Sequence, residues 1–524
     1  MVRAALHRAR MLRRSSPRGT ERNFGACFIL ALLGLILLAA PAAAKTLRVA
    51  VPAWPPAMGN PYAQQVQGAA HPFPGIFDAL TVMDGGGATQ PNLAVSWSHD
   101  GANGWTFRLR PGVRFINGEP FDAAAVVAMI EWLRRPDAQR YFYAAEVKNI
   151  AAVAAVDALT VAITTRQADV ILPKRLSLLP PVPPKLWAEQ GVEGFAQRPR
   201  ATGPFVVDGF GRDQGAYALE ARPGSWRPSR HLARVEFRVI PDQAARVQAL
   251  RAGQVDLAYG IGFEDFDALA ADGFRVEVKA IATTTALALP NRRAGSPLAD
   301  VRVRRAMNHA VNRAAIAAVI MRGTVAPTAA GIEPGVFGYN PALAPYAYDP
   351  AKARALLAEA GYARGFRLKA NVLTAGTPDM AAILQQVAQD LAAVGIRLEL
   401  NSVLGTDWVQ MWASGDWRGA DVISSSWNGA TYMDAGRAVE SYTCAKPAPF
   451  FCAPEVEALF AASNVEFDAA KREAQLRQAL ALLYDLAPAL YLFPQTELMA
   501  LSPRITALPY RGRYIDWAAA DVRD

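Results

Sequence analysis

The feature that most constrains the fold is a strand-helix-strand unit that recurs in two separate parts of the chain. In the first part, the alternating run "ARVEFRVI" (233–240) is followed by the helical run "DQAARVQALRAG" and the short apolar run "VDLAYG". Two more units follow later, with "FRLKANVL", "IRLELNSV" and "ADVISSS" as the expected strands. Helices between successive strands are typical of mostly parallel sheets with right-handed crossovers. The sequence therefore predicts an α/β protein with two lobes.

Helix boundary signals support these units. Asp349 is the expected N-cap of a helix that ends at Gly361, and Thr377 is the expected N-cap of a helix that ends at Gly395. The second helix carries apolar residues at helical spacing, which predicts one buried face: Ile383, Leu384, Val387, Leu391 and Val394. A single helical stretch is expected over 301–323, with Arg302, Arg304 and Arg305 on its solvated face.

The segment "GWTFRLRPGVRFINGEPF" (104–121) contains an alternating run and two turn signals, which predict a β-hairpin. Asp122 is the expected N-cap of the helix that follows, and this helix ends before Pro136. Further along, "PPVPP" (180–184) predicts a stiff surface linker. Nothing in these segments suggests catalysis.

The N-terminal residues predict a secretory signal peptide over 1–44. Seven Arg and one Glu precede an apolar run that ends in the small residues Ala42 and Ala44, so cleavage is expected before Lys45. An uncleaved membrane anchor is the alternative, because the run approaches the ~20 residues that span a bilayer. Removing this segment lowers the net charge from +9 to near +3 (9 − 6). A nucleic-acid partner is therefore not expected.

Few residues suit a disulfide or a metal site. Cys27 lies in the expected signal peptide, which leaves Cys444 and Cys452 on either side of a short loop. In an oxidising compartment such a pair predicts a disulfide. The other potential metal ligands are scattered, since the four remaining histidines stand at 71, 99, 231 and 309. We expect no metal and no cofactor.

In open α/β sheets, ligands bind beyond the carboxyl ends of the strands. This rule nominates four loops: 53–62, 259–263, 374–377 and 427–434. Two lobes that face each other across such loops would form a cleft for a small molecule.

Enzyme motifs are missing from the sequence. It contains no Gly-x-Ser-x-Gly, His-Glu-x-x-His, Cys-x-x-Cys, P-loop or Gly-x-Gly-x-x-Gly pattern. Two carboxylates in a cleft would still permit a secreted hydrolase, and this remains the rival hypothesis. The prediction is a protein that is not an enzyme.

Several motifs together resemble the family 5 extracytoplasmic solute-binding proteins, the peptide, nickel and opine binders of ABC importers. These motifs stand in the expected order over nearly the whole chain after residue 44: "PNLAVSW" followed by "WTFRLRPGVRFINGEPFDAAAVV", "ATGPF" (201–205), "VEFRVIPDQAARVQALRAGQVDLA" (235–258), "DVRVRRAMNHAVNR" (300–313) and "YDPAKARALLAEAGY" (348–362).

The resemblance implies a two-lobed class II periplasmic binding protein with an extra subdomain in the first lobe. The first lobe would comprise 45–281, with the subdomain at about 78–200, and the second lobe 282–493; the tail 494–524 would return to the first lobe. It also implies a periplasmic monomer that delivers a peptide-like, opine or chelate solute to an ABC permease with its ATPases. A sensor protein that presents its solute to a receptor is a further alternative.

Departures from the family pattern bear on the solute. The dipeptide and oligopeptide binders hold the substrate amine with an Asp shortly after a Trp, and here "SWNGATYMDAGR" has Ala430 at that place. They hold the carboxylate with an Arg in a loop that corresponds to "TAGTPD", which has none. Asp434 or Arg437 would fill these roles if the alignment is shifted; otherwise the two form an ordinary surface ion pair. Free dipeptides are therefore doubtful solutes.

Residues in the nominated loops are the predicted solute contacts. They comprise Trp54, Met58, Tyr259, Thr374, Trp427, Asn428, Tyr432 and Asp434. Trp427 follows an expected strand, so the alternative for its ring is core packing. Trp412, which shares a helix face with Trp408, is expected to be a core residue instead.

Overall fold

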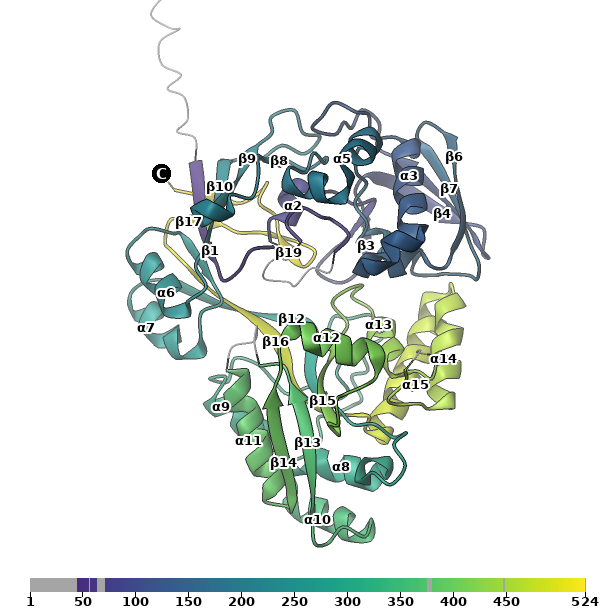
Figure 1. The fold of residues 1–524 in the computed structure, drawn as a ribbon, viewed down its shortest axis with the longest axis vertical. Coiled ribbons are helices and arrows are strands. Elements are labelled where there is room, and N and C mark those ends of the chain that lie inside the picture. The colour runs from purple at the N-terminus through teal and green to yellow at the C-terminus, as the bar shows by residue number, and fades with distance from the viewer. Residues whose placement is uncertain (1–44, 56, 64–70, 375–378, 446–447, 524) are drawn as a thin grey trace, which may run out of the picture. The chain divides into compact units, whose positions relative to one another are not determined.

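Two long strands, β12 (Arg275–Ala288) and β16 (Ala489–Leu501), form the middle of the main sheet (Figure 1). The structure is a computed structural model that describes residues 45–55, 57–63, 71–374, 379–445 and 448–523. The predicted signal peptide (1–44) lies outside these residues, as does Thr377, the expected N-cap. Among the described residues, no helix has the length and apolar character needed to cross a membrane.

The main sheet has ten strands in the order β14-β13-β15-β12-β16-β11-β1-β10-β9-β8. Its other strands are β1 (Lys45–Val51), β8 (Phe205–Val207), β9 (Ala216–Ala221), β10 (Leu232–Val239), β11 (Leu257–Tyr259), β13 (Phe366–Val372), β14 (Ile396–Ser402) and β15 (Val422–Asn428). β1 pairs in parallel with β10 and β11, and β13 does so with β14 and β15, as the strand-helix-strand units predict.

The two parallel groups do not form separate sheets. β12 and β16 pair antiparallel with each other, and they also pair with β15 on one side and β11 on the other. The β12-β16 register is interrupted between Ala280 and Thr284 and again between Thr284 and Ala286. The result is one mixed sheet in which these two strands connect both groups.

The predicted helices flank this sheet, and several local signals are confirmed. α11 (Met380–Ala392) packs against β14 with Ile383, Leu384, Val387 and Leu391 buried. Asp349 caps α10 (Pro350–Glu359) by accepting a hydrogen bond from the Lys352 backbone N–H. The remaining longer helices are α3 (Ala123–Arg134), α5 (Pro184–Gln197), α6 (Gln243–Arg251), α8 (Val301–Ala310), α9 (Arg313–Val319), α12 (Gly405–Ser414), α14 (Pro454–Val465) and α15 (Ala469–Leu486).

The single helix predicted over 301–323 is instead two helices, α8 and α9. Asn312 caps α9 by accepting a hydrogen bond from the Ala315 N–H, and this polar cap ends the continuous helix. The prediction that Arg304 lies on the solvated face was also wrong, because this residue is only 2% exposed. Its guanidinium donates to the backbone oxygens of Leu298, Ala299 and Leu486, so buried carbonyl groups replace its water.

A second sheet has the order β4-β5-β7-β6 and is entirely antiparallel. It contains β4 (Ala94–His99), β5 (Gly104–Leu109), β6 (Ile150–Asp157) and β7 (Thr160–Thr165). The predicted hairpin over 104–121 is not formed, because β5 pairs with β4 and β7. The segment after it holds only an isolated bridge between Arg114 and Pro120, since two turns leave few residues between them. Asp122 does cap α3, accepting from the Ala125 N–H.

Residues 180–184 do not form a surface linker. Pro180 to Pro183 are buried, and α5 begins at Pro184. The Pro180 oxygen accepts a hydrogen bond from the hydroxyl of Tyr62, which is itself fully buried. The proline rings at 180, 181 and 183 are therefore buried, and the carbonyl oxygen of Pro180 has a buried hydrogen-bond partner in Tyr62.

Shorter elements complete the fold around the site. α2 (Phe73–Ile76), α4 (Leu172–Leu176), α7 (Phe266–Ala271), α13 (Ala435–Val439) and the 3-10 helix η3 (Phe142–Val147) are single turns or little more. β2 (Thr81–Met83) pairs with β3 (Thr89–Pro91), and the C-terminal residues form the hairpin of β18 (Tyr510–Arg511) and β19 (Tyr514–Ile515). β17 (Ile505–Ala507) pairs with β20 (Asp521–Val522), and the Lys45 ammonium pairs with Asp521 at 3.0 Å, which holds the tail beside β1.

Candidate solute-binding site

Trp427 lies within β15 instead of after it, because the strand continues to Asn428 by pairing with β12. Its indole is fully buried and stacks on Tyr442, with ring centroids 4.1 Å apart. Tyr491 packs edge-on against the same ring. Gly331 also lies close to the indole, since an added Cβ there would come within 2.5 Å of the indole Cγ. These contacts favour the packing alternative for Trp427.

The loop after β15 begins with Asn428, whose side-chain oxygen accepts a hydrogen bond from the Thr431 N–H at 3.1 Å. This bond fixes the turn that carries Tyr432. The Tyr432 ring is buried, and its hydroxyl donates to Glu146 of η3. Arg175 of α4 contacts both groups, at 3.2 Å from the Tyr432 hydroxyl and 2.9 Å from the Glu146 carboxylate. Residues 257 and 286 positions apart in the chain thus meet here.

Asp434 is fully buried at the end of the same loop. Its carboxylate accepts from both terminal nitrogens of Arg472, at 2.7 and 2.9 Å, and lies 3.2 Å from the Lys174 ammonium of α4. It also caps α13 by accepting from the Gly436 N–H. Burial opposes ionisation, but the two cations outweigh it and hold the pKa of Asp434 below its ordinary value.

The surface ion pair predicted between Asp434 and Arg437 was therefore wrong. Asp434 pairs with Arg472 and Lys174, and Arg437 pairs with Glu440 at 2.6 Å. The reason is helix direction: capping α13 turns the Asp434 carboxylate inward, while Arg437 lies one turn later beside Glu440.

Trp54 and Met58 belong to a different neighbourhood. Trp54 is half-buried and packs on Tyr217, with ring centroids 5.5 Å apart. Met58 is buried, and the next residue, Gly59, donates its N–H to the Ala196 oxygen at 2.9 Å. This loop is thus held against the end of α5. No described contact joins it to the loop after β15.

Thr374 and Tyr259 also stand apart from that loop. The Thr374 hydroxyl lies 2.8 Å from the Ser402 hydroxyl at the ends of β13 and β14. Tyr259 is buried in β11 and stacks on His71, with ring centroids 3.9 Å apart. Of the predicted contacts, the structure therefore brings together Trp427, Asn428, Tyr432 and Asp434 and leaves the others in three separate places.

Tyr259 belongs to a buried polar cluster that the sequence did not reveal. His71 Nε2 lies 3.5 Å from the Glu497 carboxylate of β16, which faces Lys279 across the β12-β16 pair. Burial, and then Lys279, lower the pKa of His71 to about 3, so the imidazole is neutral near pH 7 and forms no ion pair. Burial raises the pKa of Glu497 to about 7, despite the opposing charges of Lys279 and Arg513.

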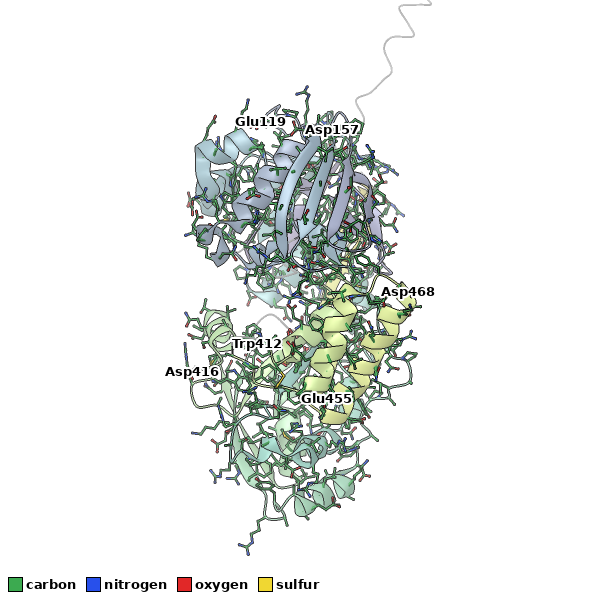
Figure 2. The ribbon with its side chains drawn as sticks, turned by 90° about the vertical axis from the view of Figure 1, so that its right-hand side faces the viewer. Glu119, Asp157, Trp412, Asp416, Glu455 and Asp468 are labelled. Atoms are coloured by element: carbon green, nitrogen blue, oxygen red, sulfur yellow. A yellow bond between two sulfur atoms is a disulfide. The ribbon has the colours of Figure 1, made fainter. Side chains whose placement is uncertain are left out.

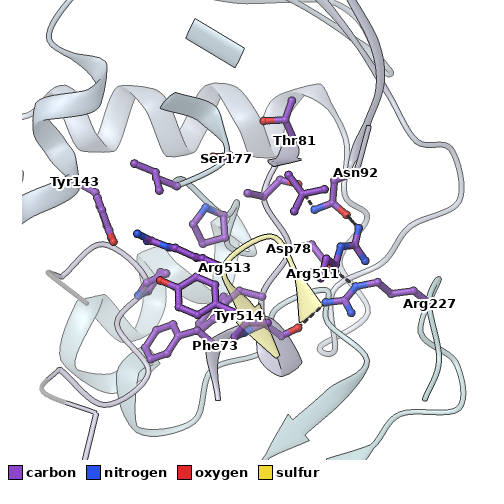
Figure 3. A pocket seen from close by; sticks show the side chains of 17 residues that line it. Phe73, Asp78, Thr81, Asn92, Tyr143, Ser177, Arg227, Arg511, Arg513 and Tyr514 are labelled. Atoms are coloured by element: carbon purple, nitrogen blue, oxygen red, sulfur yellow. Dashed lines mark hydrogen bonds and ion pairs between the residues drawn. The ribbon is translucent and has the colours of Figure 1, made fainter. Parts of the chain in front are cut away.

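A cavity of about 140 Å³ lies beside α4, η3 and the C-terminal hairpin (Figure 3). Ser177 and Leu178, which directly follow α4, line it together with Tyr143 of η3. The C-terminal hairpin contributes Arg511, Arg513 and Tyr514, and the other lining residues are Pro61, Phe73, Pro74, Phe77, Asp78, Ala79, Thr81, Val82, Asn92, Pro180 and Arg227. Sequence reasoning missed this cavity, because its walls come from seven separate segments with no shared motif.

Two further predictions concern the second part of the chain. Cys444 and Cys452 form the predicted disulfide. Trp412 of α12, labelled in Figure 2, stacks on Trp408 with ring centroids 5.7 Å apart, and both residues are half-buried. Among the described residues, no group of three or more His, Cys, Asp or Glu side chains is arranged to hold a metal ion.

A family model described as bacterial extracellular solute-binding proteins, family 5 Middle, matches residues 88–448. This chain belongs to that family. Family 5 members are solute-binding proteins, so the rival hydrolase hypothesis is not favoured. The α/β fold with its large central sheet agrees with this assignment.

The names of the curated relatives state different solutes. The glutathione-binding protein GsiB of Shigella boydii is 30% identical over 323 residues, which are 59% of this chain and 60% of that protein. The chain thus spans less than two thirds of the length of the glutathione-binding relatives that it matches. The nickel-binding periplasmic protein of Escherichia coli K12 is 26% identical over 464 residues, 83% of this chain and 86% of that protein.

Solved structures of family 5 proteins share the fold. The periplasmic binding protein DppA of Helicobacter pylori, in complex with the peptide STSA, has a TM-score of 0.77 at 21% identity and covers 92% of this chain and 98% of its own. NikA of Brucella suis, in complex with Fe(III)-EDTA, has a TM-score of 0.76 at 24% identity and covers 91% and 100%. At these identities the likeness establishes the fold alone.

Proposed function

We propose that this protein is the periplasmic solute-binding component of an ABC importer. It captures a small polar or peptide-like solute between its two lobes and delivers it, as a monomer, to permease subunits with their ATPases. Family membership supports the role in general. The observation that carries it for this chain is the buried contact of α4 with the loop after β15, through Lys174 to Asp434 and Arg175 to Tyr432.

The cavity shares its walls with the segments that make this contact. Ser177 stands three residues after Lys174, and Tyr143 belongs to η3 together with Glu146. All lining residues of the cavity lie in the expected first lobe or in the tail that returns to it, so the cavity forms one side of the proposed site. A solute that reaches from this cavity to the loop after β15 favours the contact, because only the closed arrangement offers both sets of groups.

The predicted solute residues divide into two roles under this proposal. Tyr432 and Asp434 act by connecting the loop after β15 to η3 and α4, because their polar atoms already have protein partners. Trp54, Met58, Tyr259, Thr374, Trp427 and Asn428 remain proposed contacts or supports of the solute. The cavity lining adds Tyr143 and Ser177 to this set.

Native mass spectrometry of the protein purified from its own periplasm tests the proposal. We expect a stoichiometric small molecule that is released on denaturation. A fluorescence titration against peptides, opines, sugars and metal chelates gives the affinity. A protein that carries no molecule and responds to none of the panel would contradict the proposed function.

Lys174→Gln tests the closing contact. The variant leaves Arg472 to neutralise Asp434 but removes the link from α4, so we expect weaker solute retention at nearly unchanged stability. The matched control is Lys185→Gln, because Lys185 is exposed at the start of α5 and carries the same charge. Equal retention by both variants would rule out a role for the contact.

A further inference from the structure

The cavity beside α4 is mainly apolar at one end. Phe73 of α2 and Phe77, which directly follows this helix, stack with ring centroids 5.4 Å apart, and Leu178 and Pro180 lie on the segment that follows α4. Phe77, Leu178 and Pro180 are buried. Such a wall offers no hydrogen bonds from its side chains, so it suits an apolar group.

The other end of the cavity carries two cations on a tight hairpin. Arg511 ends β18, and Arg513 precedes β19, so only Gly512 separates them. Gly512 has a φ of +61°, as two-residue hairpin turns require, and an added Cβ would lie 2.7 Å from the Met83 oxygen. The turn is therefore seated on β2, and the positions of both arginines are fixed by backbone.

The two hairpin arginines differ in their partners from the third arginine of the cavity lining. The third arginine, Arg227, is neutralised by Asp78, with Nε 2.6 Å from the carboxylate. Asp78 is further occupied, because it accepts hydrogen bonds from Trp226 and Thr202. Arg511 donates instead to the neutral side chain of Asn92, at 2.6 Å.

Arg513 likewise has neutral groups as its direct partners, although its charge also acts on Glu497 at longer range. Its guanidinium interacts with the hydroxyls of Tyr143 and Tyr514 and points toward Tyr143 in Figure 3. In the described ranges, no carboxylate lies within ion-pairing distance of Arg511 or Arg513. Burial, and then the nearby Arg227, lower the pKa of Arg511, and the carboxylates of Asp78 and Asp516 offset this only in part.

We propose that Arg511 and Arg513 bind a carboxylate of the solute while an apolar group of the same solute packs against Phe73 and Phe77. This inference rests on the proposed function and names its solute class: small organic acids with an apolar part. It also accounts for the absence of an arginine in the loop "TAGTPD", because the C-terminal hairpin supplies the cations from another direction.

The geometry sets the specificity. A guanidinium offers several N–H donors in a planar fork, which matches the two oxygens of a carboxylate. An amide of the same shape provides one acceptor oxygen and an N–H₂ group that faces donors. A carboxylate should therefore be preferred over the matching amide, and the preference should depend on the two arginines.

The test compares 4-phenylbutyrate with 4-phenylbutanamide, a pair that differs only at the acid group, by isothermal titration calorimetry after removal of any retained molecule. We expect the acid to bind at least about tenfold more tightly than the amide. The Arg511→Gln/Arg513→Gln double variant should lose this preference. The Arg511→Lys/Arg513→Lys double variant keeps both charges and should retain part of the preference for the acid.

Arg364→Gln is the control, because Arg364 is exposed and outside the cavity while the net charge changes in the same sense. Equal binding of acid and amide, no measurable binding of either, or a preference that survives the double Gln variant would each overturn the inference. These results leave the proposed function standing if the native protein still carries a solute. A native protein that carries none and ignores the whole panel refutes the function itself.

Discussion

Arg472 holds the carboxylate of Asp434 with both terminal guanidinium nitrogens, and neither side chain is more than 5% exposed. Lys174 approaches the same carboxylate at 3.2 Å from α4. The single negative charge of Asp434 therefore pairs with two positive charges, those of Arg472 and Lys174. The contact joins α15, which carries Arg472, to the loop after β15 and to a helix 260 residues earlier in the chain.

Asp434→Asn should be strongly destabilising. The amide oxygen can still cap α13, but Arg472 and Lys174 lose their counter-charge in a buried site. We expect the free energy of unfolding to fall by about 3–5 kcal/mol in urea denaturation at pH 7. Because the pKa of Asp434 is lowered in the folded state, its stabilisation is present above about pH 4 and is lost as the pH falls through the folded value.

Glu473→Gln serves as the control for Asp434→Asn. Glu473 also lies on α15, but it pairs with Arg477 at the surface, where both side chains are at least 34% exposed. Its loss should cost at most about 0.5 kcal/mol. A loss as small as this for Asp434→Asn would show that the buried pair contributes little.

Local signals in the sequence predicted the elements well, because they depend on neighbouring residues. The caps at Asp122 and Asp349 and the buried face of α11 each require residues three to eleven positions apart, and all were confirmed. Arg304 was placed wrongly because a long cationic side chain on a helix has the same pattern whether it meets water or buried carbonyl groups.

The candidate site was only partly predictable, because its contacts join distant segments. The Glu146–Tyr432 bond spans 286 residues, and no motif announces it. Arg511 and Arg513 lie in a C-terminal stretch without periodicity, so only the fold shows that they face α2. The loops beyond the strand ends remain predictions, and the rule gives no information on which of these loops meet.

Glu497→Gln should stabilise the protein at high pH. The folded pKa of Glu497 is about 7 against an ordinary value of 4.5, so the folded state binds the proton more tightly than the unfolded state. The wild type therefore loses stability as the pH rises through this window, and the variant does not. We expect the variant to be more stable by up to about 3 kcal/mol at pH 8 and nearly equal at pH 4.

Thermal denaturation from pH 4 to pH 8 measures this difference. Glu399→Gln is the matched control, because Glu399 is an exposed strand residue paired with Arg367 at 3.4 Å, and an exposed pair of this kind contributes at most about 1 kcal/mol. A Glu497→Gln variant that is less stable than the wild type at pH 8 would mean that Lys279 outweighs burial and keeps the carboxyl ionised.

Loss of the disulfide between Cys444 and Cys452 should be moderately destabilising. The bridge closes a loop with a sequence separation of 8, for which the chain-entropy estimate is roughly 2–3 kcal/mol. The Cys444→Ser/Cys452→Ser variant should show this loss in urea denaturation. The reductant dithiothreitol should destabilise the wild type and leave the variant unchanged. Alkylation of both cysteines in the untreated native protein would contradict the bridge.

Trp427 allows its two possible roles to be separated. Trp427→Phe keeps an aromatic ring against Tyr442 but leaves part of the buried space empty, and Trp427→Ala empties most of it. We expect Trp427→Ala to cost about 3–5 kcal/mol and Trp427→Phe less. Because the indole is fully buried, Trp427→Phe should retain solute as the wild type does, whereas a stacking role predicts a clear loss of retention in native mass spectrometry.

Gly331→Ala supplies the second half of this test. An added Cβ would lie 2.5 Å from the indole, and the φ of +75° is itself unfavourable for alanine, so the single variant should be destabilising. In the Trp427→Ala background the clash disappears and only the backbone cost remains. The two losses should therefore be less than additive by about 1–3 kcal/mol in a double-mutant cycle. Strict additivity would mean that the indole does not rest on Gly331, and the packing role of Trp427 would have to be abandoned.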